Sequence, residues 1–374
     1  MSQMKAVRRR TRFTGFCSAL VLTSSVLLST GGTSRASQSA PSAGPDVYRF
    51  FTKPVLVKNS PTNLKYFDVS WEDNVTRRYY LADRSNNAID VVDSATDTFI
   101  GFIGKGQYTG AVACPGQPEE MRLCAGPNGV ITDDLHHVWA GDGNGNIIEA
   151  GDKPAAAIIR SIPTGGTGRI DEFAYDPVDQ VVLAENDGNF PPYLTFIAAT
   201  SGRLLGFYIY PKDQDGMEQP VWDPETRLFY QNVPGRQNRI DVFDPRKLPR
   251  PVKSIPVSCS GGLLGLTVSG LTVGPKGVLM TVCGSRGGAA IDPVTGKVLG
   301  IVPRGADADE VWYDSGTNNY YFSGNEALNV VNASTLQFIR SIPLPSHSVA
   351  VDARNHHVFV PVAGKGIFVV TMKR

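Results

Sequence analysis

Short runs of alternating apolar and polar residues follow one another along most of the chain. The runs are rich in β-branched and aromatic side chains, and Gly, Asn, Asp and Pro separate them, as in β-strands joined by tight turns. No stretch beyond the N-terminal region shows the sustained periodicity of an amphipathic helix. The pattern therefore predicts a protein built from many short β-strands.

The runs recur with a period of about 40–50 residues, four strands to a unit, which is the signature of a β-propeller. The innermost strands of seven such units are expected within residues 66–73, 127–134, 171–177, 218–224, 269–275, 309–315 and 347–353. The fold class is thus all-β, a seven-bladed β-propeller. The seventh unit lacks a fourth strand, so we expect residues 47–58 to complete it and close the ring.

The first 36 residues predict an export signal. A basic segment is followed by a short apolar one, "FCSALVLTSSVLL", and by small residues at Ser34 and Ala36. We therefore expect a signal peptide at 1–36, a flexible leader at 37–46 and the propeller at 47–374. The general and twin-arginine export routes both stay open. After signal removal we expect no membrane insertion and a periplasmic or secreted location.

Charge and cysteine content narrow the classes of partner. Lys+Arg is 36 and Asp+Glu is 35, so the balance gives no support to nucleic-acid binding. We expect a monomer whose partner is a small-molecule ligand or another exported protein. The four cysteines beyond the signal predict two disulfides, Cys114–Cys124 and Cys259–Cys283. Four reduced, buried cysteines are the alternative.

A polar residue stands five positions before the turn position of every inner strand. Equivalent positions lie at one height around a propeller axis, so we expect a ring at one mouth of the channel. Crowded carboxylates repel one another unless a cation neutralises them, and oxygen-rich sites suit Ca²⁺ or another divalent ion. The alternative is a solvated channel lining. The ring positions are Asp68, Asn128, Asp171, Glu218, Ser269, Asp309 and His347.

Other polar residues receive different interpretations. His347 offers a nitrogen ligand or a general base, and Arg169 could pair with a ligand carboxylate. The aspartates at the turn positions, such as Asp176, Asp223 and Asp314, are interpreted as turn chemistry. The histidine pairs 136–137 and 356–357 share one place in the repeat. We interpret them as turn residues on the opposite rim rather than metal ligands.

The segment "IDVVDSATDTFIGFI" (89–103) resembles the YVTN-type repeats of bacterial seven-bladed propellers. The resemblance extends over essentially the whole chain after the signal. It implies the fold but not the chemistry, because propellers support many functions.

A second resemblance is local. "MEQPVWDP" (217–224) and "GPNGVITDD" (126–134) are similar to two strands of the senescence-marker-protein/gluconolactonase family. This likeness implies Glu218 and Asn128 as ligands of a divalent metal that polarises a lactone carbonyl. That family has six blades, the opposite order of the two motifs and a third ligand motif that is not reproduced here.

Together, the ring and this likeness predict a divalent-cation or small-ligand site, and they extend to a metal-dependent lactonase-type hydrolase. The hydrolase would use His347 or Glu218 as the proton acceptor. The predicted metal ligands are Glu218, Asn128, Asp171 and Asp309, and the predicted ligand-binding residues add Asp68 and Arg169. The alternative function is a non-catalytic binding platform.

Overall fold

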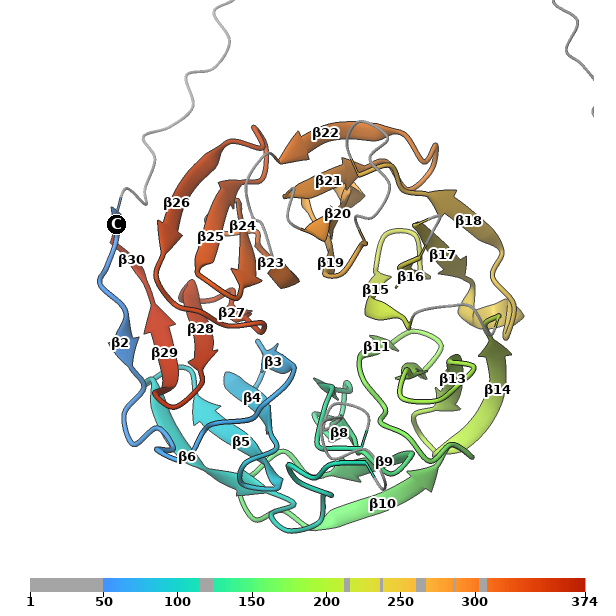
Figure 1. The fold of residues 1–374 in the computed structure, drawn as a ribbon, viewed down its shortest axis with the longest axis horizontal. Helices are drawn as coiled ribbons and strands as arrows, with labels where there is room; N and C mark the ends of the chain where they lie inside the picture. The colour runs from blue at the N-terminus through green and yellow to red at the C-terminus, as the bar shows by residue number, and fades with distance from the viewer. Residues whose placement is uncertain are drawn as a thin grey trace, which may run out of the picture. The chain divides into compact units, whose positions relative to one another are not determined.

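The computed structural model describes residues 50–114, 124–211, 216–235, 238–259, 267–284, 287–302 and 308–373. Seven four-stranded antiparallel sheets surround a common axis (Figure 1). The predicted seven-bladed β-propeller is therefore confirmed. The signal peptide and the leader expected at 1–46 lie outside the described residues.

In the first six sheets the strands run outward from the axis in chain order. Sheets one to three are β3 (Ser70–Asp73), β4 (Arg78–Asp83), β5 (Ala88–Asp93), β6 (Thr98–Ile103); β7 (Val130–Thr132), β8 (Val138–Gly141), β9 (Asn146–Ala150), β10 (Ile158–Pro163); and β11 (Phe173–Asp176), β12 (Val181–Asn186), β13 (Tyr193–Ala198), β14 (Arg203–Ile209). Sheets four to six are β15 (Glu218–Asp223), β16 (Leu228–Val233), β17 (Arg239–Phe243), β18 (Lys253–Pro256); β19 (Leu271–Val273), β20 (Leu279–Val282), β21 (Gly288–Ile291), β22 (Val298–Val302); and β23 (Ala308–Asp314), β24 (Asn319–Gly324), β25 (Leu328–Asn332), β26 (Phe338–Ile342). Two 3₁₀ turns, Pro245–Lys247 and Pro275–Gly277, are the helical elements of the described residues.

The seventh sheet joins the two ends of the propeller. It contains β27 (Ala350–Asp352), β28 (His357–Val362) and β29 (Gly366–Val370), and its outer strand is β2 (Val55–Leu56) from the N-terminal side. A further pair, β1 (Phe50–Phe51) with β30 (Met372–Lys373), extends this closure. The predicted closure by residues 47–58 is confirmed.

The hydrophobic core is divided between the sheets rather than gathered in one place. Seven buried apolar clusters of described residues each lie between two neighbouring sheets. Between the first and second sheets, for example, Tyr80 and Val91 pack with Val138 and Ile148. Alternate residues of one strand face opposite neighbours, so every sheet contributes to two cores. The inner strands are left with polar ends along the axis.

The turn between the first and second strand is the same in all seven sheets. Each has a non-glycine residue with positive φ, a costly conformation for a side chain with a Cβ. Several of these side chains reach the preceding sheet: Arg77 lies 3.3 Å from Asp352, and His136 Nδ1 lies 2.7 Å from Asp73 Oδ2. The positions are Arg77, His136, Gln180, Arg227, Lys276, Asn318 and His356.

The turn aspartates accept hydrogen bonds from the backbone of their own turns. Val178 N donates to Asp176 Oδ1 (2.8 Å), and Glu225 N donates to Asp223 Oδ1 (3.0 Å). Their interpretation as turn chemistry is confirmed.

Both predicted disulfides, Cys114–Cys124 and Cys259–Cys283, are present. Two disulfides suggest an oxidising compartment, extracellular or periplasmic. Among the described residues, no helix has the length and apolar character needed to cross a bilayer.

Candidate functional site

A cavity of about 530 Å³ lies at the end of the channel where the inner strands begin. We call it the acidic mouth. Six of the seven ring positions line it, so residues spread over about 280 positions of sequence meet here because the sheets surround one axis. Its lining residues are Asp68, Val69, Arg84, Arg169, Asp171, Glu172, Glu218, Thr267, Ser269, Gly284, Ala308, Asp309, Glu310, Asn325 and His347.

The seventh ring position, Asn128, is fully buried beside the cavity. Its Oδ1 accepts a hydrogen bond from Arg84 Nε (3.0 Å), and Arg84 also pairs with Asp68. The oxygen that the family likeness assigns to a metal is therefore used by a guanidinium. Arg84 follows the second strand of the first sheet, and an analysis confined to inner strands could not find it.

Arg169 is surrounded by carboxylates of the chain itself. It pairs with Asp171, lies 2.7 Å from Asp187 Oδ2 and lies 3.8 Å from Asp68 Oδ2. Its side chain is 13% exposed. The charge of this guanidinium is balanced internally, so a ligand carboxylate would have to compete with three acidic side chains.

Asp68 connects the cationic groups of this wall. Burial opposes its ionisation, but Arg84, His347 and Arg169 outweigh burial and hold the pKa of Asp68 well below its usual range. His347 Nε2 lies 3.5 Å from Asp68 Oδ1, and its ring stacks on Phe67 at 4.7 Å. Burial lowers the pKa of His347, but the bond to Asp68 more than compensates, so its pKa is raised. The imidazole is held toward its protonated form.

Other carboxyl groups of the acidic mouth have no matching cations among the described residues. Glu172 and Glu218 make no side-chain hydrogen bond or ion pair with any residue that the structure describes. Glu310 Oε2 accepts from Ser348 Oγ (3.1 Å) and Val349 N (3.0 Å), whereas its Oε1 is buried without a described partner. The mouth is therefore electrostatically divided into a paired half and an unpaired half.

The protonation of the unpaired half reflects this division. Burial, followed by repulsion from neighbouring carboxyl groups, raises the pKa of Glu172 and Glu218 well above the usual range. Burial raises the pKa of Glu310 in the same way, although the hydrogen bonds from Val349 N and Ser348 Oγ oppose the shift. Burial also raises the pKa of Asp171 to about 7, although Arg169 opposes the shift. A cation placed here would favour the ionised forms and relieve the repulsion.

Glu172 and Glu310 escaped the sequence analysis because each directly follows a ring position. Strict alternation in a strand would turn them away from the side that Asp171 and Asp309 occupy. In β23 the pairing with β24 skips from Ala308 to Glu310, a β-bulge that re-aims the side chains on either side. The paired acids in "RIDEF" and "ADEVW" were the available signal.

A second cavity, of about 400 Å³, lies deeper along the inner strands. We call it the aromatic cavity. Val69 and Glu172 line both cavities, and the side chain of Gln219 accepts from Leu271 N (2.8 Å) of the neighbouring sheet. Its aromatic lining comes from Trp71, Phe173, Tyr175, Trp222, Trp312 and Tyr313. The sequence analysis did not single out this cavity.

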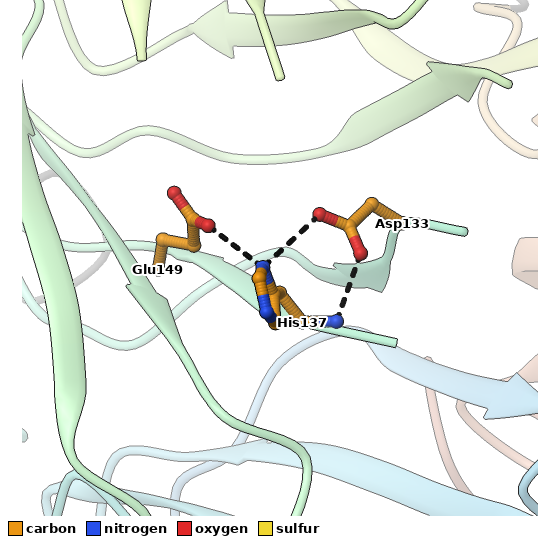
Figure 2. Close-up of side chains that lie close together, drawn as sticks. All are labelled: Asp133, His137 and Glu149. Carbon is orange, nitrogen blue, oxygen red and sulfur yellow. Dashed lines mark hydrogen bonds and ion pairs between the residues drawn. The ribbon is translucent and has the colours of Figure 1, made fainter. Parts of the chain in front are cut away.

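A third group lies in the second sheet, away from the ring. Figure 2 shows His137 Nδ1 between Glu149 Oε1 (2.9 Å) and Asp133 Oδ2 (3.6 Å). These three side chains could hold a metal ion. His137 lies just before β8, at the predicted turn position, so the site involves a histidine that we had interpreted as structural.

The donor atoms of this third group already have partners. Arg160 Nε lies 2.6 Å from Glu149 Oε2, and Asp133 accepts from His137 N (2.8 Å) and Trp139 Nε1 (3.0 Å). A metal would have to compete with Arg160 for Glu149 and with the donors that already bond Asp133. In contrast to the unpaired half of the acidic mouth, Glu149 has a cationic partner here, although its Oε2 makes no hydrogen bond among the described residues.

Comparison with known proteins supports the fold. No family model matches the chain, and no curated protein matches it. Among solved structures, a chain in a crystal structure of the mitotic checkpoint complex is similar with a TM-score of 0.61 and 10% identity, covering 94% of this chain and 100% of that one. At this identity the likeness concerns the fold alone.

The class of protein follows from these observations. The chain is a disulfide-bonded seven-bladed β-propeller whose central channel has an acidic mouth with unpaired carboxyl groups. Solved chains that match number 1534, so the architecture is too widely shared to indicate an activity. Function must be argued from the channel.

Proposed function

We propose that this chain is an exported β-propeller that binds a divalent cation at the unpaired half of its acidic mouth. The observation that carries the proposal is the convergence of Glu172, Glu218 and Glu310 on one cavity without cationic partners among the described residues. Asp309 also lines this cavity. Such a set suits a hard cation with oxygen ligands, Ca²⁺ above all.

The ligand set differs from the one that the gluconolactonase likeness implies. Glu218 remains a member, but Asn128 is engaged by Arg84, and Asp171 is engaged by Arg169. The proposed ligands are therefore Glu218, Asp309, Glu310 and Glu172. Repulsion from the two arginines and His347 favours a cation position near the carboxyl groups that they do not neutralise.

Thermal unfolding with and without added Ca²⁺ tests this proposal. A ligand that binds only the native state at a hundredfold excess over its dissociation constant adds about 2.7 kcal/mol. For a chain of this size we expect the melting temperature to rise by several degrees relative to chelator. Glu218→Gln should abolish most of that rise. In chelator this variant should melt at or above the wild-type temperature, because a half-buried carboxyl without a cationic partner among the described residues is removed.

Glu225→Gln is the matched control. Glu225 lies in the same sheet as Glu218, at the exposed turn on the other end of β15. The same chemical change there should leave the calcium-dependent rise intact. Equal melting of the wild type in Ca²⁺, Mg²⁺, Mn²⁺ and chelator would contradict the proposal.

Lactone hydrolysis is a second candidate for the same site. It is favoured by Glu218, a free carboxyl with a raised pKa at the proposed cation position. A bound divalent ion would polarise a lactone carbonyl, and Glu218 could accept a proton from the attacking water. His347 is less suited to accept a proton because Asp68 favours its protonated form, whereas a bound cation would favour the ionised form of Glu218. Lactone turnover by the wild type that Glu218→Gln abolishes would support hydrolysis, whereas cation binding without turnover would leave a binding platform.

A further inference from the structure

The aromatic cavity occupies the channel beyond the layer formed by Val69, Glu172 and Gln219. Its volume of about 400 Å³ falls in the range of small-molecule sites. Three tryptophans from the first, fourth and sixth sheets, Trp71, Trp222 and Trp312, contribute to its wall. Nothing in the proposed cation function uses these rings.

The rings are held in fixed positions. Trp71 and Trp312 meet edge to face at 5.3 Å and 66°, across the narrow inner strand of the seventh sheet. Trp71 Nε1 donates to Thr132 Oγ1 (3.0 Å), and Tyr175 OH donates to Asp134 Oδ1 (2.6 Å). A guest would therefore meet preformed aromatic surfaces, at little cost in side-chain ordering.

One acidic side chain gives this cavity its polarity. Glu172 lines it, carries no ion pair with a described residue and faces further carboxyl groups of the acidic mouth. Aromatic faces attract cations, and quaternary ammonium groups are bound by such cages. Because an ammonium carrying alkyl groups needs few or no hydrogen-bond acceptors, it suits a mostly apolar wall better than a primary amine does.

We propose that the aromatic cavity binds an N-alkylated ammonium group, with Trp71, Trp222 and Trp312 contacting its alkyl groups and Glu172 supplying the negative charge. The site is distinct from the proposed divalent-cation site and shares only Glu172 with it. The two sites can therefore be tested separately through residues that belong to one of them alone.

Choline and its neutral isostere 3,3-dimethylbutan-1-ol are matched probes, since they differ in a nitrogen and its charge. Tryptophan fluorescence reports directly, because three of the four tryptophans of the chain line the cavity. We expect a saturable change with choline and at least about tenfold weaker binding of the isostere. Glu172→Gln should lower the affinity for choline about tenfold and leave the affinity for the isostere unchanged.

Trp222→Leu separates this proposal from the preceding one. This substitution should lower the affinity for choline about two- to thirtyfold, while the calcium-dependent rise in melting temperature stays at its wild-type size. Trp222→Phe, which keeps an aromatic ring, should lose less affinity for choline. Circular dichroism should confirm that each variant is folded. Equal affinity for the two probes, or no saturable signal with choline, would overturn the proposal whatever Ca²⁺ does.

Discussion

The two ends of the inner strands carry acidic residues five positions apart, but these residues differ in whether hydrogen-bond donors and cations surround them. At the turn end, Asp314 accepts from Gly316 N (2.9 Å) and Thr317 Oγ1 (2.8 Å) and lies 2.9 Å from His356 Nδ1. At the mouth end of neighbouring strands, Glu172 and Glu218 have no such partner in the described part of the chain.

The difference teaches how one repeat supplies both stability and a site. A turn carboxylate has backbone donors within its own turn, and the positive-φ residue of the next sheet adds a cation or an amide. A mouth carboxylate depends for its partners on side chains from other sheets. In half of the mouth those side chains are themselves carboxyl groups. Residue type and spacing are alike, but the first environment stabilises the charge and the second leaves it available to a ligand.

The largest expected effect comes from breaking the turn end. Asp314→Ala removes a fully buried acceptor that Gly316 N, Thr317 Oγ1 and His356 Nδ1 contact. We expect a loss of about 3–5 kcal/mol in the free energy of unfolding, measured by urea denaturation. Glu218→Gln at the mouth should lose no free energy of unfolding when it is measured in chelator. If both variants were equally destabilised, the contrast between the two ends would fail.

A change of pH is expected to have an intermediate effect on the free energy of unfolding. Burial raises the pKa of Asp171 from 3.8 to about 7, so the folded state holds a proton that the unfolded state releases. By linkage its contribution to stability is complete below pH 3.8 and is lost as pH rises toward 7, by at most about 1.4 kcal/mol per pH unit. Asp171→Asn should flatten the profile over that window. An unchanged slope would show that Asp171 is not the group responsible.

The smallest effect is expected on the exposed rim. Arg227 and Asp179 lie 3.3 Å apart with side chains 41% and 29% exposed. Arg227→Ala should change the free energy of unfolding by about 0–1 kcal/mol, and 1 M salt should remove most of that difference. A loss comparable to that of Asp314→Ala would mean that the turn network acts as a single cooperative unit.

Much of the fold was accessible from the chain because the repeat is local. Apolar alternation and turn residues determine each strand pair without reference to the rest of the molecule. The missing fourth strand of the last unit likewise indicated that an N-terminal segment, now β2, must pair with β29. The two disulfides followed from cysteine count and position.

The sequence predicted only part of the candidate site. Placing Asp68, Asp171 and Glu218 at one mouth required nothing beyond the repeat and its closure. Arg84 and Asp187 could not be found this way, since each reaches the mouth from the end of a second strand. Gln219 lies on the inner strand β15 but directly follows the ring position Glu218, so the ring pattern did not include it. The metal-compatible group of Asp133, His137 and Glu149 was missed because its third member lies in a different strand of the sheet.

The sequence alone determined the number of sheets, their order, their closure and which side chains face the axis, because these follow from short-range periodicity. Only the tertiary structure decided which of the axial carboxylates are neutralised. That outcome depends on where two arginines and one histidine from separate sheets come to lie, and on the bulge beside Glu310 in β23. Electrostatic partnership is a property of distances across the ring, and no local pattern encodes those distances.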